Sequence, residues 1–495
     1  MKNELICLFI LTITLSIWPP DGRALPIDWN GTFSVDTTVV GTYTRTDENT
    51  GAAQIDGSQE IPGVPGGANT ASFQTHTFKL RPTIIINDAA SLFGEITTGH
   101  SSGGYFGQGL ERAGSGDGSS GMRGLGNALY NYTSYRDAAH FRYLYTKYYA
   151  DTTTYIIGRQ PFHWALGAIF NDGQGRMDRF ATIEDGIMAH FNVGNFRFSP
   201  YYMQASGDTL DDDGQMKSTG VQALYQSSER DLALGLLFGK RKSSPLGGRF
   251  KTAWQTSSNE PGALGSTDVR VLDFYFQKSI DRLQFQLEIP IIDGDLGQVY
   301  GAGESNTYDA KAFIGKASYE LNHSWNIALD MGHISGDRGR QTQAFEALYL
   351  HPNYQVAHLM FRYNMHAVRD KKKEENIFDS YMTNMNFAKI LASYKADKWV
   401  FNMGLIWASA IETARSGQEA FHHERNTPFS AGGDQSNDYG FELDLDFEYK
   451  WNSNISLLGS MGYHFVGDYY AYRPSGTPIS LQNSYAVQLK TLILF

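Results

Sequence analysis

The sequence predicts an all-β fold, an antiparallel transmembrane β-barrel of about 18 strands with short turns at one end and long loops at the other. First, residues 485–495 alternate between two faces and end on Phe495, as the last strand of a bacterial outer-membrane barrel does. Second, no run after Trp18 has the roughly 18–20 uncharged apolar residues of a membrane-spanning helix. Third, residues 441–449 alternate apolar side chains with carboxylates, which require water on their side.

Residues 1–24 have the composition of a secretory signal peptide. A lysine near the start precedes an apolar run over 5–18, and Gly22-Arg23-Ala24 provides small residues at the −3 and −1 positions of a cleavage site. We therefore expect the mature chain to begin at Leu25. Because the single cysteine, Cys7, lies in this leader, we expect no disulfide or thiol chemistry in the mature protein.

Residues 25–495 are predicted to form one outer-membrane β-barrel domain, since no linker, charge block or change in composition divides them. The 52 glycines, 29 tyrosines and 30 phenylalanines fit many strands with turns and aromatic belts. The formal net charge of −11 argues against nucleic-acid binding.

Short polar turns alternate with long loops along the chain, and this alternation gives the strand count. Short connections are expected near Asn87-Asp88, Asp151-Thr152, Val193-Gly194, Glu229-Arg230, Ile280-Asp281, Asn322-His323, Ala396-Asp397 and Trp451-Asn452. The longer segments are 46–70, 100–137, 160–183, 206–217, 242–268, 291–305, 336–379, 413–437 and 466–483. Eight turns and nine loops join eighteen strands and place both chain ends on the side of the short turns. That side is the periplasm in outer-membrane barrels.

Residues 356–363 are the one place where the count is ambiguous, because they could form a nineteenth strand. An odd number would place the C-terminus outside, whereas bacterial single-chain barrels have an even number of strands. We therefore assign this segment to the seventh long loop.

The best strands indicate which face of the wall is wet. Along 282–289 and 78–86, apolar residues recur at every second position, and the residues between them are mostly polar or charged, as along 441–449. A barrel of about eighteen strands is too wide for side chains to fill its interior. The sequence therefore predicts a water-filled lumen.

Charged residues expected to face the lumen fall into two arcs of the ring. The pore-lining basic residues are Lys79, Arg81, Arg142, Arg159, Arg197 and Lys490. The pore-lining acidic residues are Asp273, Glu288, Glu320, Asp330, Glu442, Asp444, Asp446 and Glu448. Glu95 lies among the bases, and Arg282 and Lys316 lie among the acids. Opposed arcs predict a transverse field that orients charged or zwitterionic solutes; alternatively, these charges only keep the lumen wet and pair locally.

Loop 160–183 is too apolar for a freely solvated excursion. We expect it to fold inward as a constriction, with Arg176, Asp178 and Arg179 near the narrowest point. The alternative is packing against the rim or against a neighbouring protomer.

No catalytic, cofactor or metal site is predicted. The acidic run Asp208–Asp213 lacks the closing glutamate of a calcium loop, and adjacent residues in His422-His423-Glu424 point to opposite sides of an extended chain. The glycine-rich run 114–121 lacks the Lys-Ser/Thr ending of a phosphate loop. The serines lack the context of a nucleophile elbow, so enzymatic activity is not expected.

Two short windows resemble the alginate-export family of outer-membrane porins. They are Tyr155-Ile-Ile-Gly-Arg-Gln160 and the stretch in which Ser335-Gly-Asp337 leads to Phe345-Glu-Ala-Leu348-Tyr349 and His351. The resemblance implies a monomeric barrel of eighteen strands. Exporters of that family have a basic tunnel, whereas this chain has a long acidic wall at 442–448, which argues against alginate itself.

Together these observations predict an outer-membrane porin that passes small hydrophilic solutes such as sugars or organic acids. The alternative is a surface-exposed binding or structural barrel with a plugged lumen. Expected partners are outer-membrane lipid, the barrel-assembly machinery and lipopolysaccharide, whose phosphates the cluster Lys371–Lys373 could contact. No cofactor is expected.

Overall fold

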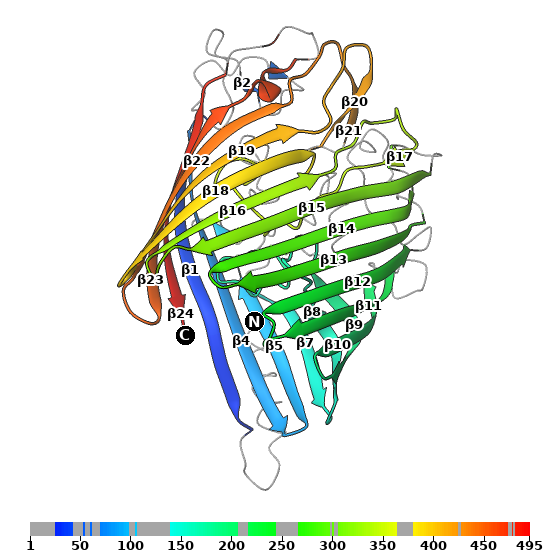
Figure 1. The fold of residues 1–495 in the computed structure, drawn as a ribbon, viewed down its shortest axis with the longest axis vertical. Helices are drawn as coiled ribbons and strands as arrows, with labels where there is room; N and C mark the ends of the chain where they lie inside the picture. The colour runs from blue at the N-terminus through cyan, green and yellow to red at the C-terminus, as the bar shows by residue number, and fades with distance from the viewer. Residues whose placement is uncertain are drawn as a thin grey trace, which may run out of the picture.

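Eighteen long antiparallel strands form the wall of a closed barrel in the computed structural model (Figure 1). The structure describes residues 25–42, 53–54, 60–61, 70–98, 104–105, 139–205, 216–243, 266–297, 299–300, 305–363, 380–423, 427–473, 478 and 481–495. The expected signal segment 1–24, the acidic run 208–213, the glycine-rich run 114–121, Lys371–Lys373 and Glu424 lie outside the described residues.

The wall strands follow the chain in order around the ring. They are β1 (Ile27–Gly41), β4 (Thr70–Asn87), β5 (Ala90–Thr98), β7 (His140–Tyr149), β8 (Thr153–Pro161), β9 (Ile183–Val193), β10 (Phe196–Ala205), β11 (Met216–Ser227), β12 (Leu232–Ser243), β13 (Asp268–Ile280), β14 (Leu283–Gly297), β15 (Asn306–Glu320), β16 (Trp325–Ile334), β18 (Met385–Ala396), β19 (Trp399–Ala410), β22 (Asp438–Lys450), β23 (Ile455–Val466) and β24 (Ser484–Leu494).

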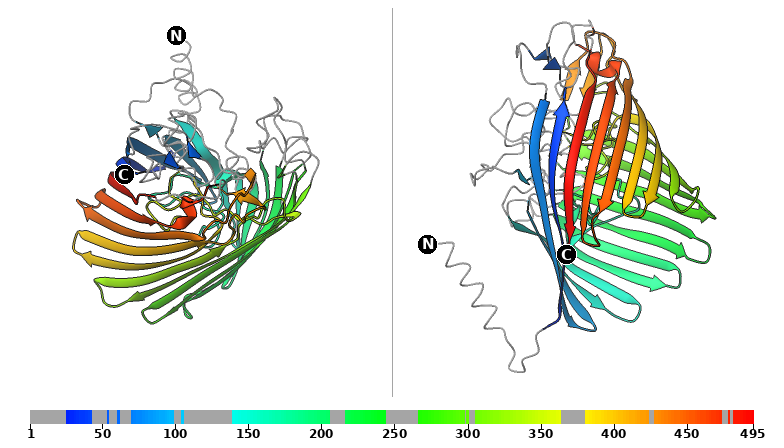
Figure 2. Two further views of the ribbon diagram at one scale, coloured as in Figure 1. Left: turned by 90° about the horizontal axis from the view of Figure 1, so that it is seen from above. Right: turned by 90° about the vertical axis from the view of Figure 1, so that its left-hand side faces the viewer.

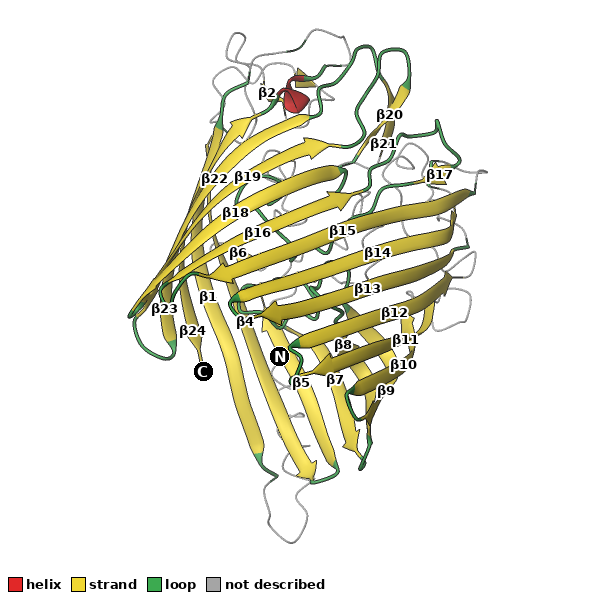
Figure 3. Cartoon of the chain, in the orientation of Figure 1, coloured by secondary structure: helices red, strands yellow, loops and turns green. Residues whose placement is uncertain are grey.

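Short elements lie at the end of the barrel that carries the long loops. The two-residue strands β6 (Gly104–Tyr105) and β17 (Ala344–Phe345) join the same sheet, and separate hairpins are formed by β2 (Ala53–Gln54) with β3 (Glu60–Ile61) and by β20 (Glu419–His422) with β21 (Thr427–Ser430). Within the described residues, strands and loops dominate, with the short 3-10 helix η3 (Asp468–Ala471) at the loop end (Figure 3).

The predicted connections are confirmed. Each of the eight short turns joins two neighbouring wall strands, and the nine long segments join the others at the opposite ends. Residues 356–363 contain no strand and belong to the seventh long loop, as expected from the parity of the count.

β1 closes the ring because it pairs with both β4 and β24. The closure reaches the last residue: the Gly31 N–H donates to the Phe495 carbonyl (2.6 Å), and the Phe495 N–H donates to the Gly31 carbonyl (3.1 Å). The Phe495 ring lies over Gly31, where a Cβ would be 2.5 Å from the ring, and it stacks on Phe78 at 6.1 Å. Aromatic cover of a strand glycine is a known stabilising arrangement in sheets.

The outer face of the wall is apolar and exposed. On β22, Phe441, Leu443 and Leu445 are each more than a third exposed, whereas Glu442 and Asp444 between them are buried on the inner face. The same alternation occurs on β12, where Leu234, Leu236 and Phe238 point outward. Such a wide apolar surface is stable only when it faces the lipid of a bilayer. Seen from above, described loop segments lie inside the ring (Figure 2).

Candidate functional site: two inward segments anchored by wall charges

Residues 162–182, between β8 and β9, cross the lumen and are named here the first inward segment. The basic side of the wall holds this segment by its peptide carbonyls. Lys79 Nζ donates to the carbonyls of Gly173 (3.0 Å) and Asp178 (2.6 Å), and Arg142 donates to the carbonyl of Phe180 (2.8 Å). Each contact satisfies a charged donor and a peptide acceptor that are otherwise out of reach of water.

The acidic side of the wall holds the same segment from other directions. Glu288 on β14 accepts a hydrogen bond from the Leu166 N–H (2.7 Å), and Glu448 on β22 pairs with Arg176 (3.1 Å). Because β14 lies on the opposite side of the ring from β4, which carries Lys79, the segment extends across the lumen. This path agrees with the inward folding expected for loop 160–183. Its role in restricting flow stays a prediction.

Arg179 is the most deeply buried of the three expected constriction residues. Its guanidinium pairs with Asp36 on β1 (2.9 Å) and also contacts Thr75 on β4 (3.0 Å). Arg176 is about half exposed. Asp178 accepts a bond from the Gly175 N–H (2.9 Å), and burial raises its pKa above the ordinary value.

Residues 351–363, within the seventh long loop, form a second inward segment. Glu442 on β22 accepts hydrogen bonds from three consecutive N–H groups, those of His358 (2.7 Å), Leu359 (2.6 Å) and Met360 (2.7 Å). Lys389 on β18 donates to the Val356 carbonyl (2.6 Å). The wall thus holds this segment, too, by its peptide groups.

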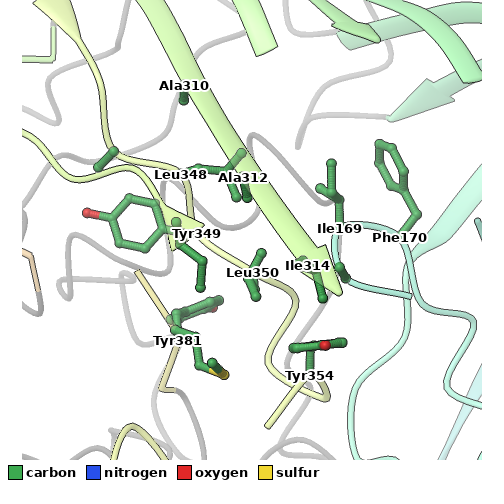
Figure 4. Packing of buried hydrophobic residues seen from close by; sticks show 14 of the residues in the cluster. Ile169, Phe170, Ala310, Ala312, Ile314, Leu348, Tyr349, Leu350, Tyr354 and Tyr381 are labelled. Carbon is green, nitrogen blue, oxygen red and sulfur yellow. The ribbon is translucent and has the colours of Figure 1, made fainter. Parts of the chain in front are cut away.

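The two inward segments contact each other. The Asn353 side chain donates to the Phe180 carbonyl (2.8 Å) and accepts from the Phe180 N–H (3.0 Å), and the His351 N–H donates to the Ala168 carbonyl (2.7 Å). Around these bonds, Ile169 and Phe170 of the first segment pack in one apolar cluster with residues of β15 and of the seventh loop (Figure 4). The paired segments therefore form one packed unit inside the barrel.

The expectation that all carboxylates along 441–449 face water is wrong for two of them. Glu442 is fully buried and Asp444 is 1% exposed, because the second inward segment covers them. Asp446 and Glu448, nearer the short turns, keep partial exposure; Asp446 lies 2.8 Å from His358 Nε2. Peptide N–H groups replace water at Glu442, and Lys389 Nζ lies 3.9 Å from the Asp444 carboxylate.

The other acidic positions lie on the inner face as well. Asp273 and Glu288 are both fully buried beside the first inward segment. Asp330 lies opposite Lys316 and Lys389 in the strand registers, and Glu320 is exposed at the end of the lumen with the short turns.

The basic positions are largely paired. Arg81 and Arg142 both bind Glu95 (2.6 and 2.9 Å), and Lys490 lies 3.5 Å from Asp36. Arg197 is exposed on the inner face, where it donates to Asn192 (3.2 Å). Pairing leaves little free positive charge on this side, so the alternative of local pairing describes the geometry better than an unscreened basic wall. The transverse field itself stays a prediction.

The assignment of Arg159 to the lumen is wrong. Arg159 shares the outward face of β8 with Tyr155 and Ile157, and its guanidinium makes two bonds of 2.8 Å to Asp185 on the neighbouring strand. Gln160, 2% exposed, occupies the inner face instead. The pair lies next to the long-loop end of the strand, where outward charge can reach the polar headgroup region.

Sequence reasoning missed several anchoring residues. Asp36 and Glu184 are inward acids within the basic half of the wall, and each binds an arginine, Arg179 and Arg241 respectively. Lys389 is the corresponding base within the acidic half. Alternation along β1, β9 and β18 was sufficient to place all three on the inner face.

At the long-loop end, residues of the stretch 335–351 form a buried network with neighbouring loops. Asp337 accepts hydrogen bonds from the Tyr300 hydroxyl and from the N–H groups of Gly339 (2.7 Å) and Glu346 (2.8 Å). Burial raises the pKa of Asp337 to about 6, and burial lowers the pKa of His423, which accepts from the Asp337 N–H, to about 3. These hydrogen bonds connect the long loops at this end of the barrel to one another.

Within the described ranges, no group of three or more His, Cys, Asp or Glu side chains is arranged to hold a metal ion. No helix in the described part of the chain is long and apolar enough to cross a membrane.

A closed, even-numbered ring of antiparallel strands with an apolar outer face and charged inner residues defines a β-barrel of the bacterial outer membrane.

Solved structures with a similar chain path include three from Pseudomonas. A BenF-like porin from Pseudomonas fluorescens Pf-5 is 8% identical, with 95% of this chain and 99% of that chain covered and a TM-score of 0.49. OccK11 (OpdR) from Pseudomonas aeruginosa is 9% identical over 94% of this chain and 96% of that chain, with a TM-score of 0.48. OpdK from the same species, crystallised with vanillate, is 9% identical over 94% and 98%, also with a TM-score of 0.48. No family model matches the sequence, and no curated protein matches it.

Proposed function

We propose that this protein is an outer-membrane porin that passes small hydrophilic solutes through a lumen narrowed by the two inward segments. The observation that supports the proposal is the anchoring of the first inward segment to opposite sides of the ring, at Lys79 and Arg142 on one side and at Glu288 on the other. Glu442 holds the second inward segment beside it. A fixed internal constriction in a wide polar barrel restricts which solutes pass. The role is transport rather than catalysis.

Supporting features lie at the two levels of the lumen. Below the constriction, Arg197 and Glu320 are exposed on the inner wall, as expected where water fills the barrel. At the constriction, Arg176 and Glu448 form the partly exposed pair that a passing solute would meet. We further propose that the signal segment 1–24 is removed and that the barrel-assembly machinery inserts the mature chain into the outer membrane. There the barrel contacts lipopolysaccharide.

The two windows that resemble the alginate-export family do not name a solute. Tyr155–Gln160 forms part of the wall in β8, and Ser335–His351 is packed among the loops. Small solutes fit the geometry better than a long polymer, because the packed unit of the two inward segments occupies the lumen.

The alternative function is a binding or structural barrel whose lumen is plugged. The contacts of Asn353 and His351 with the first inward segment favour it, since they join the two segments into one body. Planar-bilayer recordings of the refolded chain separate the two functions: stable single-channel steps are expected for the porin, and a silent barrel identifies the plug.

Deletion of residues 164–178 tests the constriction directly. The deletion removes most of the first inward segment together with its wall contacts at Leu166, Gly173, Arg176 and Asp178. Single-channel conductance should therefore rise severalfold while the barrel remains folded. An unchanged conductance would show that the first inward segment does not limit flow.

A further inference from the structure

We propose that the short-turn end of the lumen contains a binding pocket for neutral polyhydroxylated solutes of the size of a mono- or disaccharide. This inference rests on the proposed channel function and adds a solute class to it. A pocket of about 390 Å³ lies among the ends of β13, β14, β15, β16 and β18. Its volume is within the range of about 300–1,000 Å³ that is usual for small-molecule sites.

Small uncharged polar side chains create this pocket. They are Ser279, Gln284, Ser318, Asn326 and Ser393. All five lie on the inner face, because they alternate with outward residues such as Ile280, Phe285 and Tyr319. The strand registers pair Ser279 with Gln284, Gln284 with Ser318, and Asn326 with Ser393.

The chemistry of this row matches hydroxyl groups. Serine hydroxyls and glutamine or asparagine amides each donate and accept hydrogen bonds, as sugar hydroxyls do. Side chains on neighbouring strands are about 4.8 Å apart, so a pyranose-sized solute can contact several of them at once. None of the five can neutralise a carboxylate or an ammonium group.

The charged groups at the rim leave the pocket close to neutral. Asp281 and Glu320 are matched in number by Arg282 and Lys395. Arg282 also donates to the Leu321 carbonyl (2.9 Å), and the remaining ionisable group, His323, lies 3.9 Å from Glu320 on the exposed side. A balanced rim gives no strong preference for either sign of charge.

Uncharged polar residues of β13 and β14 lie between the pocket and the constriction, where Lys316 of β15 is the neighbour of Gln286. On β13 and β14, Gln277 accepts hydrogen bonds from the Tyr275 hydroxyl (2.6 Å) and from the Gln286 amide (3.3 Å). The next inner residue of β14 is Glu288, which holds the first inward segment. A neutral solute that passes the constriction therefore meets hydrogen-bonding groups all the way to the pocket.

Sugar-induced block of KCl current through the full mature chain measures the binding. Maltose should reduce the current reversibly, and Gln284→Leu and Ser318→Ala should each weaken its apparent affinity about fivefold, the value of one net hydrogen bond. Gln226→Leu is the matched control, because Gln226 is an inner amide near a short turn of β11 but lies outside the pocket. This control should leave the affinity unchanged.

Gluconate and glucosamine test neutrality, since they carry opposite charges on similar polyhydroxylated frames. Stronger block by either one than by a neutral sugar, or equal losses in Gln226→Leu and Gln284→Leu, would overturn the proposal. Calorimetry of the detergent-solubilised protein with maltose detects the pocket without conduction. Binding that Gln284→Leu weakens supports the pocket even in a silent barrel, where only the channel function fails, and absence of binding refutes it.

Discussion

At the scale of the residue, Glu442 illustrates how a buried carboxylate can organise a stretch of backbone. Its two oxygens accept hydrogen bonds from three consecutive peptide N–H groups. The negative charge is therefore stabilised by donors that belong to one short stretch of backbone. Glu442 is fully buried and therefore has no water to replace these donors. One side chain in the wall thus fixes the position of the second inward segment.

Glu442→Gln should loosen that segment. An amide presents a single acceptor oxygen and an N–H₂ group that opposes the peptide donors, so we expect a local loss of about 2–3 kcal/mol. Amide hydrogen exchange at Leu359 and Met360 should become about 30- to 150-fold faster. Glu320→Gln, at an inner carboxylate that contacts neither inward segment, is the control; equal protection in wild type and Glu442→Gln would disprove the anchoring role.

Asp337 should make the packing of the long loops depend on pH. Because its pKa in the folded protein is raised to about 6, the folded state binds the proton more tightly than the unfolded state does. The stabilisation is fully present below about pH 4 and is lost as pH rises through about 6. Proteolysis of the loops should therefore be slower at pH 5 than at pH 7.5, and Asp337→Asn should remove most of this difference. A pH profile that Asp337→Asn leaves unaltered would contradict the assignment.

Alternation predicted side-chain direction well where the strand is regular and less well elsewhere. It placed Glu442 and Lys79 inward because their neighbours are apolar. Arg142 shares sequence parity with the outward Leu144 but points inward, since the register shifts beside it between Glu95 and Ile96. The registers of β8 run without a shift through Arg159, and the apolar Tyr155 and Ile157 on its own face already indicated its outward direction.

At the scale of the element, the first inward segment depends on contacts of unequal strength. The Arg179 to Asp36 pair is almost fully buried, whereas Arg176 is half exposed in its pair with Glu448. A buried charge that loses its partner is costly, and an exposed pair contributes little. The segment should therefore be fixed mainly at its Arg179 end.

Arg179→Ala should destabilise the barrel by about 3 kcal/mol, because Asp36 then keeps Lys490 as its one remaining cation among the residues that the structure describes. Arg176→Ala should cost under about 1 kcal/mol. Urea unfolding of the two variants, followed by tryptophan fluorescence, provides the comparison. Similar midpoints for both would show that burial does not separate the two pairs.

The sequence predicted the elements because strands and turns are local patterns. The inward path of loop 160–183 also followed from its apolar composition. The wall residues that bind this loop could not be predicted from the sequence, because Lys79 and Arg142 bind peptide carbonyls, which every residue possesses. Only the path of the chain through the lumen decides which carbonyls they meet.

At the scale of the whole molecule, closure of the ring depends on the seam between β1 and β24. The registers run from Thr32 with Leu494 to Gly41 with Tyr485, and glycines at both ends lie beneath aromatic rings. A Cβ at Gly41 would be 2.2 Å from the Tyr485 ring. The seam therefore tolerates no side chain at these two positions unless a ring moves.

Gly31→Val should reduce the yield of closed barrel, because its side chain would displace Phe495 and also approach the Lys79 carbonyl, 2.7 Å from the Cβ position. Gly315→Ala, where the nearest atom is 3.4 Å away, is the control. The heat-dependent mobility shift of the refolded barrel on gels measures closure. A normal shift in Gly31→Val would mean that the seam closes without the aromatic contact.

The inward segments are anchored through their peptide groups, by Lys79, Arg142, Lys389 and Glu442, and this affects which sequence changes the segments can accept. Anchors that recognise the backbone are indifferent to the side chains carried by the anchored segment. Residues of the inward segments that face the solute path can then be exchanged while the scaffold keeps them in place. A barrel built in this way can acquire a new solute preference by substitutions in a few loop positions, with its frame left intact.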